Sequence, residues 1–344
     1  MTALWTRLFG SDLPVIGAPM AGGGSTPALV SAVTDAGGFA FLAAGYQSPE
    51  TLAARMTELR RTGTPFGVNV FVPGTDRISE PEFRRYAREL APEGEPYGLD
   101  LANAPLVEDD DHWRDKLDLL LADPVPVVSF TFGLPELPTV RALRRAGSRV
   151  LATVTTLAEA RAARDLGVDG LVAQSTEAGG HSGTHDPGRP MPPTTVERLL
   201  DEFGPATGLP VVVAGGVDGP ERVRRLVAAG AAGVLVGTLL LRTDESGASR
   251  PHRDALADPA GTGTVLTRVF TGRPARALRN GLVDRHQTSA PLGYPAIHHL
   301  TRELRAAAVR ADEPDLVHLW AGTGYRNART GPAADVVAAL TATM

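Results

Sequence analysis

The residues best suited to chemistry gather in one glycine-rich segment, residues 174–185, which reads Gln-Ser-Thr-Glu-Ala-Gly-Gly-His-Ser-Gly-Thr-His. Imidazole titrates near neutral pH, so His181 could act as a base or hold a substrate oxygen by a hydrogen bond. His185 precedes Asp-Pro-Gly-Arg-Pro, which is typical of a solvent turn, and a role for it is not favoured. Gly183 also separates the two histidines, which argues against the helix that a metal site would need. The segment therefore predicts an active-site loop without a metal.

Two glycine-bearing turns indicate a site for a phosphate. Gly215 and Gly216 follow one apolar run, and Leu235, Val236, Gly237 and Thr238 end another. Backbone N–H groups exposed by glycine, together with the Thr238 hydroxyl, can bind phosphate oxygens, although such glycines can also merely ease a tight turn. The chain has no dinucleotide-binding or P-loop glycine motif after its first strand, so the pattern favours a mononucleotide or a phosphorylated metabolite.

Three further features could contact the same ligand. Ala18, Pro19 and Met20 form a rigid corner before Gly22–Gly24, where a flat ring could lie against bare backbone; Ser25 or Thr26 would then cap the following helix. Asn69 and Gln174 interrupt apolar runs with amides, which need hydrogen-bond partners if they are buried. Neighbouring backbone could supply those partners, or a ligand could.

The elements that must position these residues alternate between short apolar runs and amphipathic segments, which is the pattern of repeated βα units. We predict strands at 14–18, 39–43, 66–71, 125–130, 149–154, 170–174, 210–214 and 233–236, and helices at 27–36, 49–61, 135–146, 157–166, 194–203 and 220–229. Such a series favours a closed (β/α)8 TIM barrel over an open doubly wound sheet. Residues that follow the strands would then meet at one rim.

The remaining chain predicts additions to the barrel. We assign residues 1–78 and 124–284 to the barrel and the polar stretch 79–123 to a helical insertion. Residues 285–344, which contain helical patterns at 299–311 and 333–343, form a C-terminal helical extension expected beside the barrel mouth.

Composition narrows the possible partners. The 344 residues carry a formal charge of -5, and only one of the 34 basic residues is a lysine, so neither nucleic acid nor a membrane surface is expected as a partner. The chain has no cysteine, which excludes disulfides and thiolate chemistry, and any redox reaction must use another cofactor. No stretch has signal-peptide or membrane-span character, so we expect a cytoplasmic protein, as a monomer or homodimer.

With these residues in view, the chain resembles the nitronate monooxygenase family, which are FMN-containing TIM-barrel enzymes. The resemblance runs essentially end to end; it includes residues 14–23, 67–69, 129–135, 173–174, 177–181, 214–217, 272–276 and 320–322. It implies that Asn69, Gln174, Gly179, Gly216 and residues 235–238 contact FMN, that Met20 lines its ring, and that His181 is the active-site histidine. Gly180 and Gly215 belong to the same predicted cofactor site.

The implied activity is oxidation of an alkyl nitronate, such as propionate 3-nitronate, or a nitroalkane by O2 to a carbonyl compound and nitrite. Two departures concern specificity: Ser175 stands where the family commonly has glycine, and Thr323 where it more often has glutamine. Two alternatives stay open. One is an NAD(P)H-dependent FMN reductase of enoyl thioesters or quinones, and the other is a noncatalytic binding protein.

Overall fold

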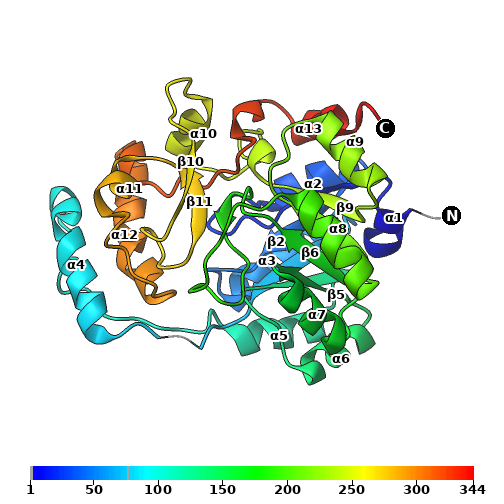
Figure 1. Ribbon diagram of the computed structural model, residues 1–344, viewed down its shortest axis with the longest axis horizontal. Helices are drawn as coiled ribbons and strands as arrows, with labels where there is room; N and C mark the ends of the chain where they lie inside the picture. The colour runs from blue at the N-terminus through cyan, green and yellow to red at the C-terminus, as the bar shows by residue number, and fades with distance from the viewer. Residues whose placement is uncertain (1–2, 76) are drawn as a thin grey trace.

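The chain forms a closed barrel of parallel strands, as the alternating pattern predicts, and not an open sheet (Figure 1). The computed structural model describes residues 3–75 and 77–344. The barrel strands, in order around the barrel, are β1 (Val15–Gly17), β2 (Phe39–Ala43), β3 (Gly67–Phe71), β4 (Val127–Thr131), β5 (Arg149–Val154), β6 (Gly170–Gln174), β8 (Val211–Ala214) and β9 (Gly233–Val236). β9 pairs with β1 and closes the ring.

The inside of the barrel is filled and closed at its amino end. Ile16, Phe39, Phe41, Leu151 and Val212 pack together there with Leu8 and Phe9 of helix α1 (Leu4–Phe9). The Phe9 and Phe39 rings lie 5.0 Å apart at the amino ends of the strands. This plug leaves the carboxyl ends as the place for a ligand, as in other parallel barrels.

The barrel wall is helical, and its helices begin and end at residues suited to those positions. The wall includes α2 (Pro27–Asp35), α3 (Pro49–Arg61), α6 (Leu137–Arg145), α7 (Leu157–Leu166), α8 (Val196–Thr207) and α9 (Pro220–Ala228). Thr26 caps α2 by accepting from the Leu29 N–H, and α7 begins with a Thr156–Glu159 capping box. Gly167 ends α7 at φ 83°, in the left-handed conformation that glycine adopts readily.

The segment 79–123, expected as one insertion, contributes to two different parts of the fold. Helix α5 (Trp113–Ala122) contacts α3, α6 and β3, and so occupies the place of the wall helix between β3 and β4. Helix α4 (Glu80–Gly94) instead lies far from the barrel, against α12 (Ala296–Arg310) (Figure 1). A second hydrophobic cluster is built around α4 and α12.

The C-terminal segment divides in the same way. Helices α11 (Gly281–His286) and α12 join α4 and α10 (Arg250–Ala257) in the second cluster. Helix α13 (Ala333–Thr341) returns to the barrel and packs between α2 and α9. Since the barrel and the second cluster have separate hydrophobic cores, we propose that the chain divides into a barrel and a lobe. The lobe consists of α4 and the chain between β9 and α13.

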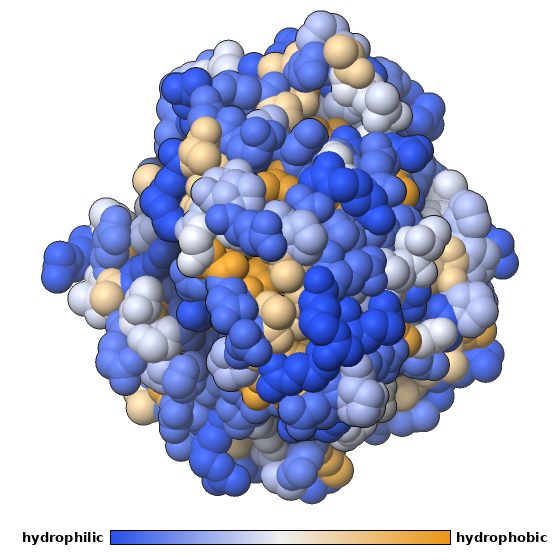
Figure 2. Space-filling view, turned by 90° about the vertical axis from the view of Figure 1, so that its left-hand side faces the viewer, coloured by the Kyte–Doolittle hydropathy of each residue, from blue (hydrophilic) through white to orange (hydrophobic). Residues whose placement is uncertain are grey.

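A small antiparallel sheet, which the sequence analysis did not predict, joins the lobe to the barrel. Its strands are β10 (Thr264–Thr267), β11 (Ala275–Leu278) and β7 (Gly180–His181), in the order β10-β11-β7. β7 has only two residues, so no alternation can reveal it. Figure 2 faces the lobe side and shows a largely hydrophilic surface with small hydrophobic areas. Within the described residues, no helix is long and apolar enough to cross a membrane.

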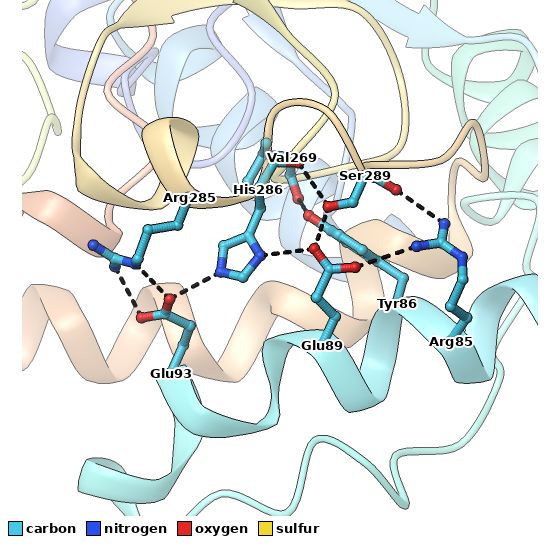
Figure 3. A network of polar contacts seen from close by, with 8 residues as sticks. All are labelled: Arg85, Tyr86, Glu89, Glu93, Val269, Arg285, His286 and Ser289. Atoms are coloured by element: carbon cyan, nitrogen blue, oxygen red, sulfur yellow. Dashed lines mark hydrogen bonds and ion pairs between the residues drawn. The ribbon is translucent and has the colours of Figure 1, made fainter.

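A polar network fastens α4 to the rest of the lobe (Figure 3). The His286 Nδ1 lies 3.1 Å from Glu89, and its Nε2 lies 2.9 Å from Glu93. Burial alone raises the pKa of both carboxyls, but hydrogen bonds from Ser289 and His286 to Glu89 and from Arg285 and His286 to Glu93 outweigh it, so each pKa is lowered. Both glutamates therefore stabilise the fold as carboxylates.

Replacing His286 with leucine should lower the free energy of unfolding by about 1–3 kcal/mol at pH 7, because two half-buried carboxylates lose a partner. Urea unfolding followed by circular dichroism measures this difference.

Because the pKa values of Glu89 and Glu93 are depressed in the folded state, their stabilisation is present above about pH 4.5 and should be lost as the pH falls. Arg224→Met removes an exposed ion-pair partner and should change stability by less than about 1 kcal/mol. Equal stability of His286→Leu and the unmodified protein would contradict the account.

Candidate active site

A cavity of about 660 Å³ opens at the carboxyl ends of the barrel strands, between the barrel and the lobe. Its volume is typical of sites for a cofactor or drug-sized ligand. The structure brings all the predicted site residues together along this one cavity. They are Ala18, Pro19, Met20, Asn69, Gln174, Gly179, Gly180, His181, Gly215, Gly216, Leu235, Val236, Gly237 and Thr238.

The loops after β8 and β9 present unpaired hydrogen-bond donors to the cavity. In the described part of the chain, the backbone N–H groups of Gly216, Gly237 and Thr238 have no acceptor. The Thr238 Oγ1 accepts a hydrogen bond from the Gly322 N–H at 2.9 Å, so the hydroxyl hydrogen is left to donate. Gly216 has φ 67°, and a Cβ there would lie 2.4 Å from the Glu177 carboxylate. Unpaired donors at this position are the groups that hold phosphates in many parallel barrels.

The corner after β1 is held rigid from behind. The Ser25 Oγ accepts from the Met20 N–H at 2.8 Å and donates to the Ala18 carbonyl at 3.0 Å. Ser25 thus braces the corner, and Thr26 alone caps the helix. The Ala18 N–H donates to the Val236 carbonyl, which ties this corner to the loop that carries Gly237 and Thr238.

The two amides have different neighbours. The Asn69 Nδ2 donates to the Ser129 and Thr131 hydroxyls, both at 2.9 Å, so its Oδ1 is the end that can accept from a ligand. The Gln174 amide instead spans the histidine loop: its Nε2 donates to the His181 carbonyl, and its Oε1 accepts from the Gly183 N–H at 2.6 Å. Gln174 lines the cavity, but its hydrogen bonds make it first a support for that loop.

His181 lies in β7, paired with Ala275 of β11, and its side chain enters an aromatic enclosure. Its ring centroid is 5.2 Å from that of Trp320, 5.7 Å from Phe132 and 5.9 Å from Tyr294. The Nε2 lies 2.9 Å from the Thr271 Oγ1. Arg273, whose guanidinium lies 3.8 Å from the Phe132 ring centroid, donates to the carbonyl groups of Ser182 and Thr184 and fixes the loop that follows.

His181 is neutral in the protein without a ligand. Burial, together with the positive charges of Arg273 and Arg305, lowers the pKa of His181 from its ordinary value of 6.5 to about 3. A neutral imidazole can accept a proton or donate one hydrogen bond, and it adds no positive charge to the cavity.

Several cavity residues were not singled out from the sequence. They are Tyr46, in the loop after β2, and His298, Arg305 and His318 of the lobe. His298 and Arg305 are seven residues apart and therefore share one face of α12. In the sequence, these residues could have been recognised as polar side chains on the apolar face of a predicted helix. A buried structural network produces the same pattern, so the pattern alone does not indicate a site.

The remaining predicted features lie outside the cavity lining. The His185 Nε2 lies 3.1 Å from the Thr153 carbonyl, and its backbone N–H donates to Glu159. Ser175 and Thr323 both contact Glu177: the Ser175 Oγ accepts from the Glu177 N–H, and the Thr323 N–H donates to the Glu177 carbonyl. The two departures from the family pattern thus contact the loop that carries Gly179. A Cβ at Gly179 would lie 2.5 Å from the Gly322 nitrogen, so this position has no room for a side chain.

A parallel barrel with unpaired donors after its last two strands and a histidine in the same cavity has the architecture of a barrel enzyme. A family model described as nitronate monooxygenase matches residues 6–343. The chain belongs to this family and is an oxidoreductase.

Individual relatives agree with the family assignment. A probable nitronate monooxygenase from Staphylococcus aureus (strain MSSA476) is 32% identical over 337 residues, which cover 96% of this chain and 94% of the relative. The crystal structure of a nitroalkane oxidase from Streptomyces ansochromogenes is 45% identical, with a TM-score of 0.91 and coverage of 98% and 96% of the two chains. FabK from Thermotoga maritima, 22% identical with a TM-score of 0.73 over 99% and 95% of the chains, shares the fold.

The neutral state of His181 can be measured directly. In the protein without ligand, ¹⁵N chemical shifts of the His181 ring should show no protonation between pH 8 and pH 5, because the pKa is about 3. Its folded pKa is depressed, so this histidine destabilises the fold progressively as the pH falls below about 6.5. A midpoint near pH 6.5 would contradict the burial and charge assigned to this side chain.

Proposed function

We propose that the protein is an FMN-dependent nitronate monooxygenase that oxidises alkyl nitronates, such as propionate 3-nitronate, with O2 to a carbonyl compound and nitrite. One observation carries this proposal. In a chain of this family, a single cavity contains both a set of hydrogen-bond donors without partners, suited to a phosphate, and a neutral histidine. The residues at one end suit a flavin mononucleotide, and those at the other suit a small planar anion.

The residues present fit FMN. The N–H groups of Gly216, Gly237 and Thr238 and the Thr238 hydroxyl would hold the phosphate, whose charge they balance by hydrogen bonding. The Ala18–Met20 corner would support the ring, and the Asn69 Oδ1 would accept a hydrogen bond from it. When bound, FMN supplies the redox step by accepting an electron from the nitronate and passing reducing equivalents to O2.

His181 would act on the substrate. Its imidazole is neutral, and the Gln174 and Thr271 contacts fix the position of its backbone and ring. A neutral imidazole can remove the proton from the carbon of a nitroalkane, or donate a hydrogen bond to the oxygen atoms of a nitronate already formed. The surrounding rings of Trp320, Phe132 and Tyr294 place apolar surface around the imidazole.

The test is the reaction itself. The FMN-loaded protein should consume O2 and release nitrite on mixing with propionate 3-nitronate, and NADPH should support no turnover. An NAD(P)H-dependent reductase of enoyl thioesters or quinones would show the reverse behaviour, with flavin reduced rapidly by NADPH and no nitrite formed from the nitronate.

Thr238→Val should weaken FMN binding roughly 10–100-fold, because it removes one hydroxyl donor to a charged phosphate while keeping the shape of the side chain. Quenching of FMN fluorescence on binding measures the dissociation constant. Thr238→Ser keeps the hydroxyl and should stay within a few-fold of the unmodified protein. Equal FMN affinity of the valine and serine variants would place the phosphate elsewhere.

His181→Asn should lower kcat about 100-fold or more with FMN still bound, since it removes the proton acceptor but no predicted phosphate donor. Nitrite release measures turnover, and the flavin absorbance of the purified protein measures its FMN content. His185→Asn changes a histidine four residues away that lies outside the cavity lining and should keep nearly full activity. Unchanged turnover of His181→Asn would remove this residue from the reaction.

A further inference from the structure

The lobe side of the cavity contains a buried positive charge with no carboxylate beside it. Arg305 of α12 is 6% exposed and lines the cavity. Throughout the described residues, no Asp or Glu oxygen lies within 4.0 Å of its guanidinium, although many other arginines of the chain have such a partner. A buried charge without a partner is costly, so a site of this kind is well suited to bind an anion.

The hydrogen bonds of Arg305 leave its Nη1 group for a ligand. The Nε donates to the Thr301 hydroxyl at 3.1 Å, and the Nη2 donates to the His298 carbonyl at 3.0 Å and to the His298 Nδ1 at 3.2 Å. The Nη1 makes no hydrogen bond to any described residue, and Arg305 lines the cavity. The Arg305 side chain is thus fixed in position while it still has donors to offer.

Arg305 also fixes the tautomer of its neighbour. A guanidinium has no acceptor, so the His298 Nδ1 must accept the hydrogen bond from Nη2. Burial and the charge of Arg305 hold the pKa of His298 well below its ordinary value, so the ring is neutral and carries its proton on Nε2. His298 lines the same cavity and therefore adds an N–H donor to those of Arg305.

The position of His298 is braced by a second layer. Its ring stacks on that of Tyr46, with the centroids 4.0 Å apart and the planes within 6°. The Tyr46 N–H donates to Asp111 at 3.0 Å, and Asp111 pairs at 2.7 Å with Lys116, which is fully buried. The one lysine of the chain thus helps to hold the aromatic ring against which His298 packs.

The FMN phosphate does not account for this site, because its proposed donors lie on the loops after β8 and β9, whereas Arg305 and His298 belong to α12 on the lobe. We propose that Arg305 and His298 form the receptor for a carboxylate at the far end of the substrate, so that the enzyme selects nitronates that carry this second anionic group. The two N–H groups of the Arg305 Nη1 and the N–H of His298 can donate to the two oxygens of a carboxylate. This inference rests on the proposed function, which places the nitronate group at His181.

The experiment compares two nitronates of the same carbon number, propionate 3-nitronate and propyl-1-nitronate, which differ by the carboxylate. The unmodified enzyme should favour the former in kcat/KM. Arg305→Met should raise KM for propionate 3-nitronate about 100-fold, because it removes the charged partner of the carboxylate, and should change KM for propyl-1-nitronate less than about 3-fold. His298→Phe, which keeps an aromatic ring on Tyr46, should raise KM for propionate 3-nitronate about 10-fold. Arg224→Met, a surface arginine of α9, should change neither.

A binding measurement separates this inference from the reaction. Titration calorimetry of the FMN-loaded protein should show that succinate binds more tightly than butyrate, which lacks the second carboxylate, and that Arg305→Met and His298→Phe each reduce this difference. If the enzyme oxidises both nitronates but these variants affect both equally or neither, the carboxylate receptor is wrong. If it oxidises neither nitronate but the preference for succinate depends on Arg305, the proposed reaction is wrong and the receptor stands.

Discussion

Closure of the parallel barrel is the constraint on which the site depends. Because all eight strands run in one direction and β9 pairs with β1, their carboxyl ends meet at a single rim. Residues as distant in the sequence as Ala18, Asn69, Gln174 and Gly216 therefore line one cavity. Helix α1 fills the opposite end with Leu8 and Phe9, which leaves the rim as the open end of the barrel.

The proposed pair of ligands depends on the distribution of charge at that rim. The barrel side offers backbone N–H groups and a hydroxyl, which bind an anion without adding a full positive charge. The lobe side offers the buried guanidinium of Arg305. Between them, the burial that lowers the pKa of His181 keeps this histidine neutral, so the reacting group meets a base or a hydrogen-bond donor and not another cation.

The barrel and its rim were predictable from the sequence because each depends on local rules. Short apolar runs predicted the strand positions to within two residues, and the glycine-bearing turns after β8 and β9 line the cavity at the rim. The lobe was not predictable in the same way. β7 is too short to show a period. A helical pattern also does not say which hydrophobic cluster a helix joins, and α5 and α13 pack on the barrel whereas α4 and α12 form the lobe. Arg305 and His298 face the cavity only because tertiary packing turns that face of α12 toward the rim.

The central claim is that this cavity holds FMN against a nitronate and not against a nicotinamide. Anaerobic mixing of the FMN-loaded protein with propionate 3-nitronate, and separately with NADPH, tests it most directly through the flavin absorbance spectrum. The account predicts a one-electron change of the flavin spectrum with the nitronate and almost no change with NADPH. Complete two-electron bleaching by NADPH, with no response to the nitronate, would contradict it.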